Sequence, residues 1–200
     1  MIRKLMIDEI ERALAARKKQ VIVDGSLTDS AVLLPIYQKE GKCHIIFTKR
    51  TDHLTHHKGQ ISFPGGGRHD DDKTLLETAL RESYEEIGLK ETDVRILGEL
   101  DDAATVTSLY RIVPFIGLIP YPYDFKIDRF EVDEVFGLPL EGLLNNANSK
   151  EENLVYGDKI IRVFTYELNG RVIWGATAWI LNQFLEILRK ASGTHRRAAK

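Results

Sequence analysis

Hydrophobic and polar positions divide the chain into segments with a helical period and segments with a strand period. Apolar residues recur every three to four positions near both ends, which predicts helices over about residues 6–19 and 176–189. The Asn169-Gly170 dipeptide is a strong hairpin signal. Shorter alternating or fully apolar segments predict strands, at residues 31–37, 44–49, 94–100, 111–119, 132–138, 160–168 and 171–174. Strands interleaved with helices predict an α/β fold.

A further helix is predicted directly after the glycines at residues 65–67, and Gly88 is expected to end it. Glu82 precedes Glu85 by three residues and Glu86 by four. On a helix these three carboxylates project from one stripe about 100° wide. The opposite stripe is expected to pack on the core, and it consists of Leu76, Ala79, Leu80, Ser83 and Ile87.

Carboxylates crowded in this way repel one another unless a cation binds. Their hard oxygen atoms suit Mg²⁺ or Mn²⁺ better than zinc, which prefers His and Cys. Arg81 lies four residues after Glu77 and four before Glu85, so it is expected to pair with one of them. Runs of Glu and Arg on helices are usually solvated surfaces. The prediction therefore depends on the fixed order of glycine turn, helix, Arg-Glu, Glu-Glu and Gly-Leu.

From Phe63 to Leu89 this order resembles the box of the Nudix hydrolase family, G-x5-E-x7-R-E-U-x-E-E-x-G-U, where U is aliphatic. Counted from Gly66, Asp72 takes the acidic position, with one extra residue before Arg81. Ser83 replaces an aliphatic residue. The longer spacing is similar to the coenzyme A pyrophosphatase branch of the family.

Residues 46–51 and 59–66 are similar to the signature that precedes the box in that branch, L-L-T-x-R-S/A-x3-R-x3-G-x3-F-P-G-G. Thr55 stands where the signature has its second arginine, so coenzyme A recognition is the least supported part of the resemblance. The neighbouring cationic residues that could replace this arginine are His53, His56, His57 and Lys58. The resemblance implies substrate contacts by Arg50, Lys58, Gly59, Gly65 and Gly66.

The likeness extends from about residue 31 to residue 188. The WGATA stretch at residues 174–178 is also similar to coenzyme A pyrophosphatases, and we interpret it as the start of a helix rather than as a substrate contact. The resemblance implies the Nudix α/β/α sandwich with a mixed sheet in one domain spanning residues 1–200. The box would occupy about residues 66–89, and residues 193–200 would form a basic tail.

The activity implied is metal-dependent cleavage of the diphosphate of coenzyme A, giving 4′-phosphopantetheine and 3′,5′-ADP. Glu82, Glu85 and Glu86 would hold Mg²⁺ or Mn²⁺, with Arg81 as a further catalytic residue. Glu131 is the expected general base and Glu134 the next candidate. Two alternatives remain open. One is hydrolysis of another nucleoside diphosphate derivative, such as ADP-ribose or a dinucleotide polyphosphate. The other is a non-catalytic nucleotide-binding domain, which would not need a clustered metal site.

Composition adds limits rather than a function. The 200 residues carry a formal net charge of −2, which predicts neither nucleic acid nor membrane as a partner. The single Cys43 fits a reducing compartment, and no apolar run approaches the roughly 18 residues of a membrane span, so a cytoplasmic location is expected. Turn chemistry explains the acidic cluster at Glu99, Asp101 and Asp102. Whether the chain forms a homodimer stays open.

Overall fold

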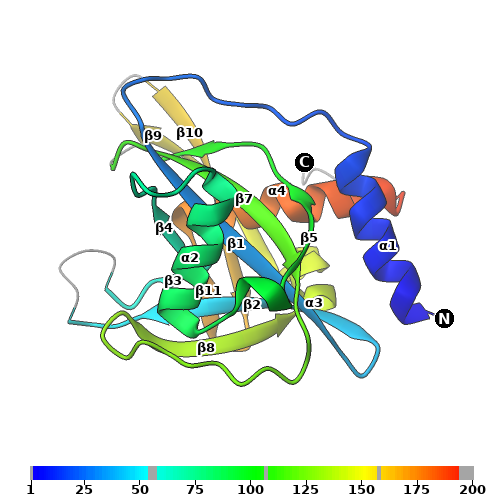
Figure 1. Cartoon of the computed structure of the whole chain (residues 1–200). Helices are drawn as coiled ribbons and strands as arrows, with labels where there is room; N and C mark the ends of the chain where they lie inside the picture. The colour runs from blue at the N-terminus through cyan, green and yellow to red at the C-terminus, as the bar shows by residue number, and fades with distance from the viewer. Residues whose placement is uncertain (1, 54–57, 106–107, 157–158, 194–200) are drawn as a thin grey trace.

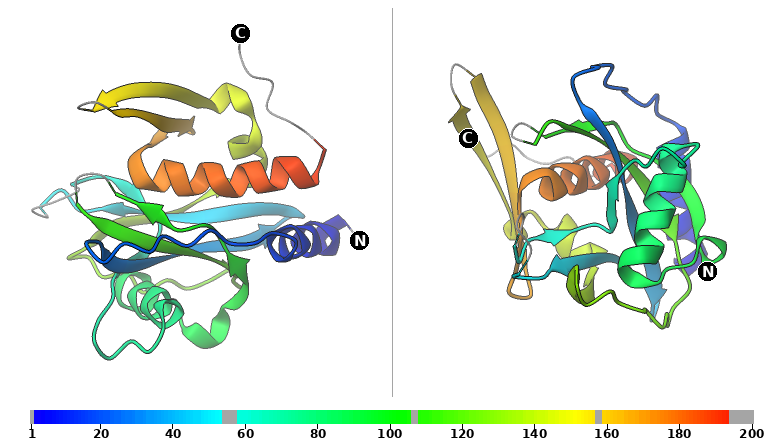
Figure 2. Two further views of the ribbon diagram at one scale, coloured as in Figure 1. Left: turned by 90° about the horizontal axis from the view of Figure 1, so that it is seen from above. Right: turned by 60° about the vertical axis from the view of Figure 1, so that its left-hand side comes forward.

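The computed structural model describes residues 2–53, 58–105, 108–156 and 159–193. Figure 2 shows four stacked layers: a small three-stranded sheet, helix α4 (Gly175–Ala191), a larger mixed sheet and helix α2 (Leu75–Ile87). The expected α/β architecture with a mixed sheet between helices is therefore confirmed. The small outer sheet is an additional layer. No helix of the described chain is long and apolar enough to cross a membrane.

Strand β1 (Thr28–Lys39) runs through the centre of the larger sheet (Figure 1). It pairs in parallel with β7 (Tyr110–Leu118) and antiparallel with β2 (Lys42–Arg50). Ala31 and Leu33 belong to the cluster that packs with α2, whereas Leu34 and Ile36 belong to the cluster that packs with α4. Because both faces of β1 are covered, its central residues 31–37 form a continuous apolar run instead of alternating with polar residues.

Two short strands from the glycine-rich segment fill the space between β1 and β2. The β1–β2 ladder is confined to its hairpin end, where Ile36 pairs with Ile45 and Lys39 with Lys42. Beyond that point β3 (Ile61–Ser62) pairs with the end of β2, and β4 (Gly65–Gly67) pairs with the start of β1. The segment predicted as a turn is therefore held by the sheet on both sides, immediately before α2.

The remaining strands extend the two sheets. In the larger sheet β5 (Arg95–Glu99) and β6 (Ala103–Ala104) pair with β7, and β8 (Val132–Pro139) pairs with β2. The small sheet has the order β11 (Arg171–Ile173), β10 (Lys159–Leu168), β9 (Ser149–Tyr156). The short helices are α3 (Leu140–Leu144), η1 (Glu91–Asp93) and η2 (Asn146–Asn148).

The N-terminal helix differs from its prediction. Helix α1 spans Ile2–Ala15 and ends four residues before the expected boundary at residue 19. The chain beyond it is held by the acidic cluster: Arg17 pairs with Asp101, and Lys19 lies 2.8 Å from Glu99 Oε2 and 3.0 Å from Asp102 Oδ1. Interpreting that cluster as turn chemistry was wrong, because its carboxylates are ion-pair partners of distant residues.

Candidate active site

Helix α2 carries the acidic residues and is fixed at both ends. Thr74 caps its start, because Thr74 Oγ1 accepts a hydrogen bond from the backbone of Glu77 at 3.2 Å. Glu77 Oε2 in turn accepts from the backbone N–H of Lys73, the residue before the cap, at 2.7 Å, and no ion pair joins it to Arg81 among the described residues. Gly88, in the left-handed conformation at φ 67°, ends the helix as predicted.

Arg81 uses all five of its N–H donors within the protein. Nε and Nη2 bind the two oxygens of Asp72 at 3.0 and 2.9 Å, and Nη2 also donates to the carbonyl of Gly67 at 3.0 Å. Nη1 donates to Glu82 at 2.8 Å and to Glu85 at 3.0 Å. All of its donors thus point to oxygens of the protein, three of whose carboxylates it links together.

Asp72 anchors this arginine from the loop before α2. It is buried, and Oδ2 also accepts from Thr78 Oγ1 and from the backbone of His69, both at 2.9 Å. The hydrogen bonds from Arg81 hold the pKa of Asp72 well below its usual range. In the sequence Asp72 takes the acidic position of the box, but its role as the anchor of Arg81 was not predicted. Asp72 precedes Arg81 by nine residues, and this spacing alone does not predict contact, because the folded loop before α2 brings the two side chains together.

The three carboxylates of the predicted stripe have different surroundings. Glu86 is only 3% exposed, and burial raises its pKa to about 8. Burial also raises the pKa of Glu82, against the opposing effect of Arg81. The Glu85 side chain is 54% exposed and bound to Arg81. Of the three carboxylates, that of Glu86 is buried, that of Glu82 is partly buried and that of Glu85 is exposed to solvent.

The glycines approach these carboxylates from the sheet side. A Cβ atom on Gly66 would lie 2.5 Å from the Glu82 carboxylate, and one on Gly65 would collide with the carbonyl of Ala31 in β1. The Gly65 N–H points to Glu86 Oε2 at 3.4 Å. A side chain at position 65 would therefore collide with backbone, whereas one at position 66 would have to displace the Glu82 carboxylate. Gly67, in contrast, has open space around it.

Arg50 and Glu131 complete the constellation. Arg50 Nη1 lies 3.7 Å from Glu86 Oε1, and its buried Nε has no hydrogen-bond partner among the described residues. The charge of Glu131 contributes to the raised pKa of both Glu82 and Glu86, so this side chain shares their electrostatic environment. A hydrogen bond of 2.9 Å from the Asp128 N–H to the Glu86 carbonyl ties the turn before Glu131 to α2.

Other predicted residues are not joined to these carboxylates by a hydrogen bond or ion pair within the described chain. Glu134 is bound by Arg171 through two contacts of 2.6 and 2.7 Å. Lys58 is exposed, and Gly59 adopts φ 63° beside Asp52. Thr55, His56 and His57 lie outside the described residues. Helix α4 begins at Gly175, which agrees with the interpretation of the WGATA stretch as a helix start.

The donor set fits a hard divalent cation. Glu82, Glu85 and Glu86 supply only carboxylate oxygens, and burial raises the pKa of Glu86 despite the opposing charge of Arg50. The described residues contain no closed group of three or more His, Cys, Asp or Glu side chains around one point. An ion held here would therefore need oxygen ligands from water or substrate as well.

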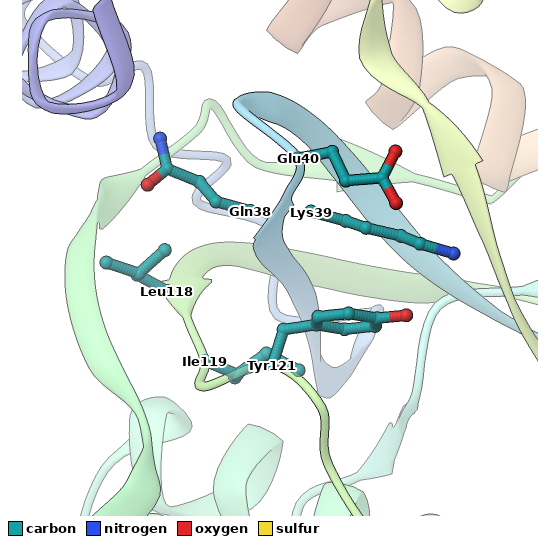
Figure 3. Close-up of a pocket in the computed structure, with 6 residues that line it drawn as sticks. All are labelled: Gln38, Lys39, Glu40, Leu118, Ile119 and Tyr121. Carbon is teal, nitrogen blue, oxygen red and sulfur yellow. The ribbon is translucent and has the colours of Figure 1, made fainter. Parts of the chain in front are cut away.

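A separate hollow of about 410 Å³ lies at the other end of β1 (Figure 3). None of the carboxylates described above lines it. The Tyr121 ring stacks on Tyr37 with centroids 4.7 Å apart, and Lys39 Nζ lies 5.7 Å from the Tyr121 centroid. Figure 3 shows the Lys39 side chain extended alongside this ring. These contacts make Tyr121 part of the packing of the strand end.

The fold and the acidic helix place the chain among α/β proteins with a carboxylate-rich site. Residues 27–155 match the family model of the NUDIX domain, and the chain belongs to the Nudix family. It is 33% identical over 157 residues to an uncharacterized Nudix hydrolase, NudL, of Yersinia enterocolitica, covering 78% of this chain and 80% of that protein. The NudL of Yersinia pestis strain Pestoides F is likewise 33% identical over 157 residues, covering 78% of each chain.

Solved structures show the same fold at lower identity. A MutT/nudix family protein from Enterococcus faecalis superposes with a TM-score of 0.57 at 13% identity, covering 93% of this chain and 79% of that one. A Nudix hydrolase from Nitrosomonas europaea gives a TM-score of 0.52 at 17% identity, covering 86% and 77%. Family and relatives together make this protein a hydrolase of pyrophosphate bonds in nucleoside diphosphate derivatives.

Proposed function

We propose that this hydrolase cleaves the diphosphate of coenzyme A or its acyl derivatives, releasing 4′-phosphopantetheine or its acyl form and 3′,5′-ADP. The supporting observation is that the segment resembling the coenzyme A pyrophosphatase signature packs directly on the acidic helix. Gly66 meets Glu82, the Gly65 N–H points to Glu86, and Arg50 lies beside Glu86. These contacts support the assignment of the signature and the carboxylates to one site.

We further propose that Glu82, Glu85 and Glu86 hold Mg²⁺ or Mn²⁺. When bound, the cation would neutralise charge on the diphosphate oxygens and acidify the attacking water. Arg50, whose Nε lacks a partner among the described residues, would donate to a phosphate oxygen. Glu131 would accept the proton of the water as its oxygen bonds to phosphorus and the bridging P–O bond breaks. The reducing conditions suited to the single Cys43 fit a cytoplasmic location.

A second candidate is another nucleoside diphosphate derivative, such as ADP-ribose or a dinucleotide polyphosphate. The observation that favours it is Thr55, which replaces an arginine of the signature. An arginine that binds phosphate contributes about 1.5 to 3 kcal/mol, which corresponds to roughly ten- to a hundredfold in affinity. Its loss would weaken coenzyme A selectively if that arginine contacts a phosphate that the other substrates lack.

A substrate panel with Mg²⁺ and with Mn²⁺, analysed by product mass, tests the proposal. The expected result is highest kcat/KM for coenzyme A or an acyl derivative. Thr55→Arg should then lower KM for coenzyme A with kcat little changed, the pattern of gained uniform binding. If the wild type hydrolyses ADP-ribose or a dinucleotide but not coenzyme A, and Thr55→Arg creates no such activity, the coenzyme A assignment is wrong and the second candidate holds.

A further inference from the structure

An exposed aromatic pair stands beside Glu131. Phe130 is 68% exposed, and the His53 ring lies against it with centroids 5.3 Å apart and an interplanar angle of 56°. Neither ring belongs to the hydrophobic clusters that stabilise the fold. An exposed phenylalanine ring contributes little to folding, and beside Glu131 this one is open to contact with a ligand.

The backbone that displays the Phe130 ring is fixed by hydrogen bonds. Its N–H donates to Asp128 Oδ1 at 2.9 Å, and its carbonyl accepts from Thr51 Oγ1 at 2.9 Å. The Thr51 N–H donates to the carbonyl of Glu131 at 3.0 Å. Thr51 is itself buried. The loop after β2 and the turn before β8 therefore form one braced unit, and the ring is pre-positioned rather than carried by a loose loop.

The residues of this unit are adjacent in sequence to Arg50 and Glu131 of the candidate site. Thr51 follows Arg50 in the chain, Phe130 precedes Glu131, and the Asp128 N–H binds the carbonyl of Glu86 at 2.9 Å. Neighbouring Cα atoms are about 3.8 Å apart, so the ring pair begins one residue from the groups expected to meet the diphosphate. A nucleotide with its phosphates at those groups would bring its base within reach of the rings.

We infer that Phe130 and His53 form the subsite for the nucleobase of the substrate, with the Phe130 ring stacking on the base and the His53 ring bordering it. The inference rests on the proposed function, because it takes the substrate to be a nucleoside diphosphate derivative. It also sets the direction of binding. The adenine nucleotide end of coenzyme A lies on the Phe130 side of the diphosphate, and the aliphatic pantetheine arm leaves on the opposite side.

Inhibition by two small molecules separates base binding from phosphate binding. 3′,5′-ADP carries the base, whereas ribose 5-phosphate does not. Each is tested as a competitive inhibitor of the nucleoside diphosphate derivative that the wild type hydrolyses fastest. Stacking on an aromatic side chain predicts that Phe130→Ala raises Ki for 3′,5′-ADP about tenfold, and KM likewise, while kcat and Ki for ribose 5-phosphate stay near wild type. Phe130→Trp should keep tight inhibition, and His53→Ala should weaken it less than Phe130→Ala.

Tyr84→Ala is the matched control, because Tyr84 is 58% exposed and also lies next to an acidic residue of the site. It should leave both Ki values unchanged. An unchanged Ki for 3′,5′-ADP in a Phe130→Ala protein that melts like wild type overturns the inference. So does an equal rise for ribose 5-phosphate, or an equal effect of Tyr84→Ala. If the wild type hydrolyses no nucleoside diphosphate, the proposed function fails instead, and calorimetric binding of 3′,5′-ADP still decides on the ring pair.

Discussion

Glu86 is a carboxylate of the proposed metal site whose burial in its charged form costs folding free energy. Its carboxylate is almost completely buried, and its one ion-pair partner among the described residues, Arg50, stands 3.7 Å away without a close hydrogen bond. Burial of a carboxylate with such incomplete pairing raises its pKa, here to about 8. The protein therefore holds a position whose charge is costly in the free state and would be neutralised by a bound cation.

The first prediction follows for Glu86→Gln. Between the unfolded pKa near 4.5 and the folded value of about 8, the folded wild type binds a proton that the unfolded chain releases, so wild-type stability falls as pH rises through this range. Glutamine does not titrate. In metal-free buffer the variant should melt above the wild type by at least about 4 °C at pH 8, with a smaller difference at pH 5.

The same variant should lose turnover by about 10² to 10³, because it removes one charge-stabilising group of the site. Thermal melts from pH 5 to pH 8 and rates at saturating Mg²⁺ measure the two effects. A variant that melts below wild type at pH 8, or that turns over normally, would contradict this assignment of Glu86.

The second prediction concerns Asp72→Asn. The lowered pKa of Asp72 means that its contribution to stability is present above the unfolded value near 3.8 and is lost as pH falls toward the lower folded value. Breaking the buried pair with Arg81 should cost about 3 kcal/mol at pH 7, and less below pH 4. Urea unfolding measures the cost, and Asp124→Asn, which removes an exposed partner of Lys126, should change stability little.

Among the elements, the two short strands β3 and β4 determine how α2 is presented. Gly65 and Gly66 pair with Val32 and Ala31, and this pairing brings the glycine backbone against the carboxylates of Glu82 and Glu86. Residues 61–67 carry too little hydrophobic periodicity to predict strands, so the sequence indicated only a turn. The sequence does not show which strands these residues pair with. Strands β3 and β4 form because β1 and β2 separate and leave space for them.

The third prediction compares two neighbouring glycines. In Gly66→Ala the new Cβ would lie 2.5 Å from the Glu82 carboxylate and displace it from Arg81, so kcat should fall by at least about tenfold while the fold persists. In Gly67→Ala the new Cβ meets nothing within 4 Å, and the carbonyl that binds Arg81 is kept. Rates and circular dichroism of both variants test this. Equal loss of activity in the two would refute the steric argument.

For the whole molecule, the site joins segments that are far apart in the chain, and this limits what the sequence could predict. The helix period and the box spacing were sufficient for α2 and its glycine stop, and they place Glu82, Glu85 and Glu86 on this one helix. The different burial of these residues could not be read from the period, because it depends on which part of the stripe the sheet covers. Strand β9 was not predicted, because its first residues, 149–153, are all polar. It is a strand because it pairs with β10.

The last prediction concerns the metal-free protein as a whole. Adding Mg²⁺ or Mn²⁺ should raise its melting temperature, because an ion that binds only the folded site stabilises it by mass action. A hundredfold excess over Kd contributes about 2.7 kcal/mol, or roughly 5 to 10 °C for a chain of this size. Below pH 8 the ion must displace the proton that the raised pKa leaves on Glu86, so the increase should be larger at pH 8 than at pH 6.

Glu86→Gln is the control for this experiment, because it already lacks the buried charge and one ligand oxygen. It should start at a higher melting temperature at pH 8 and gain little from either ion. Melting curves at both pH values and calorimetric titration provide the measurements. If millimolar Mg²⁺ and Mn²⁺ neither shift the wild-type transition nor give a binding heat at pH 8, these carboxylates are not the metal ligands, and the raised pKa of Glu86 must then be explained by folding alone.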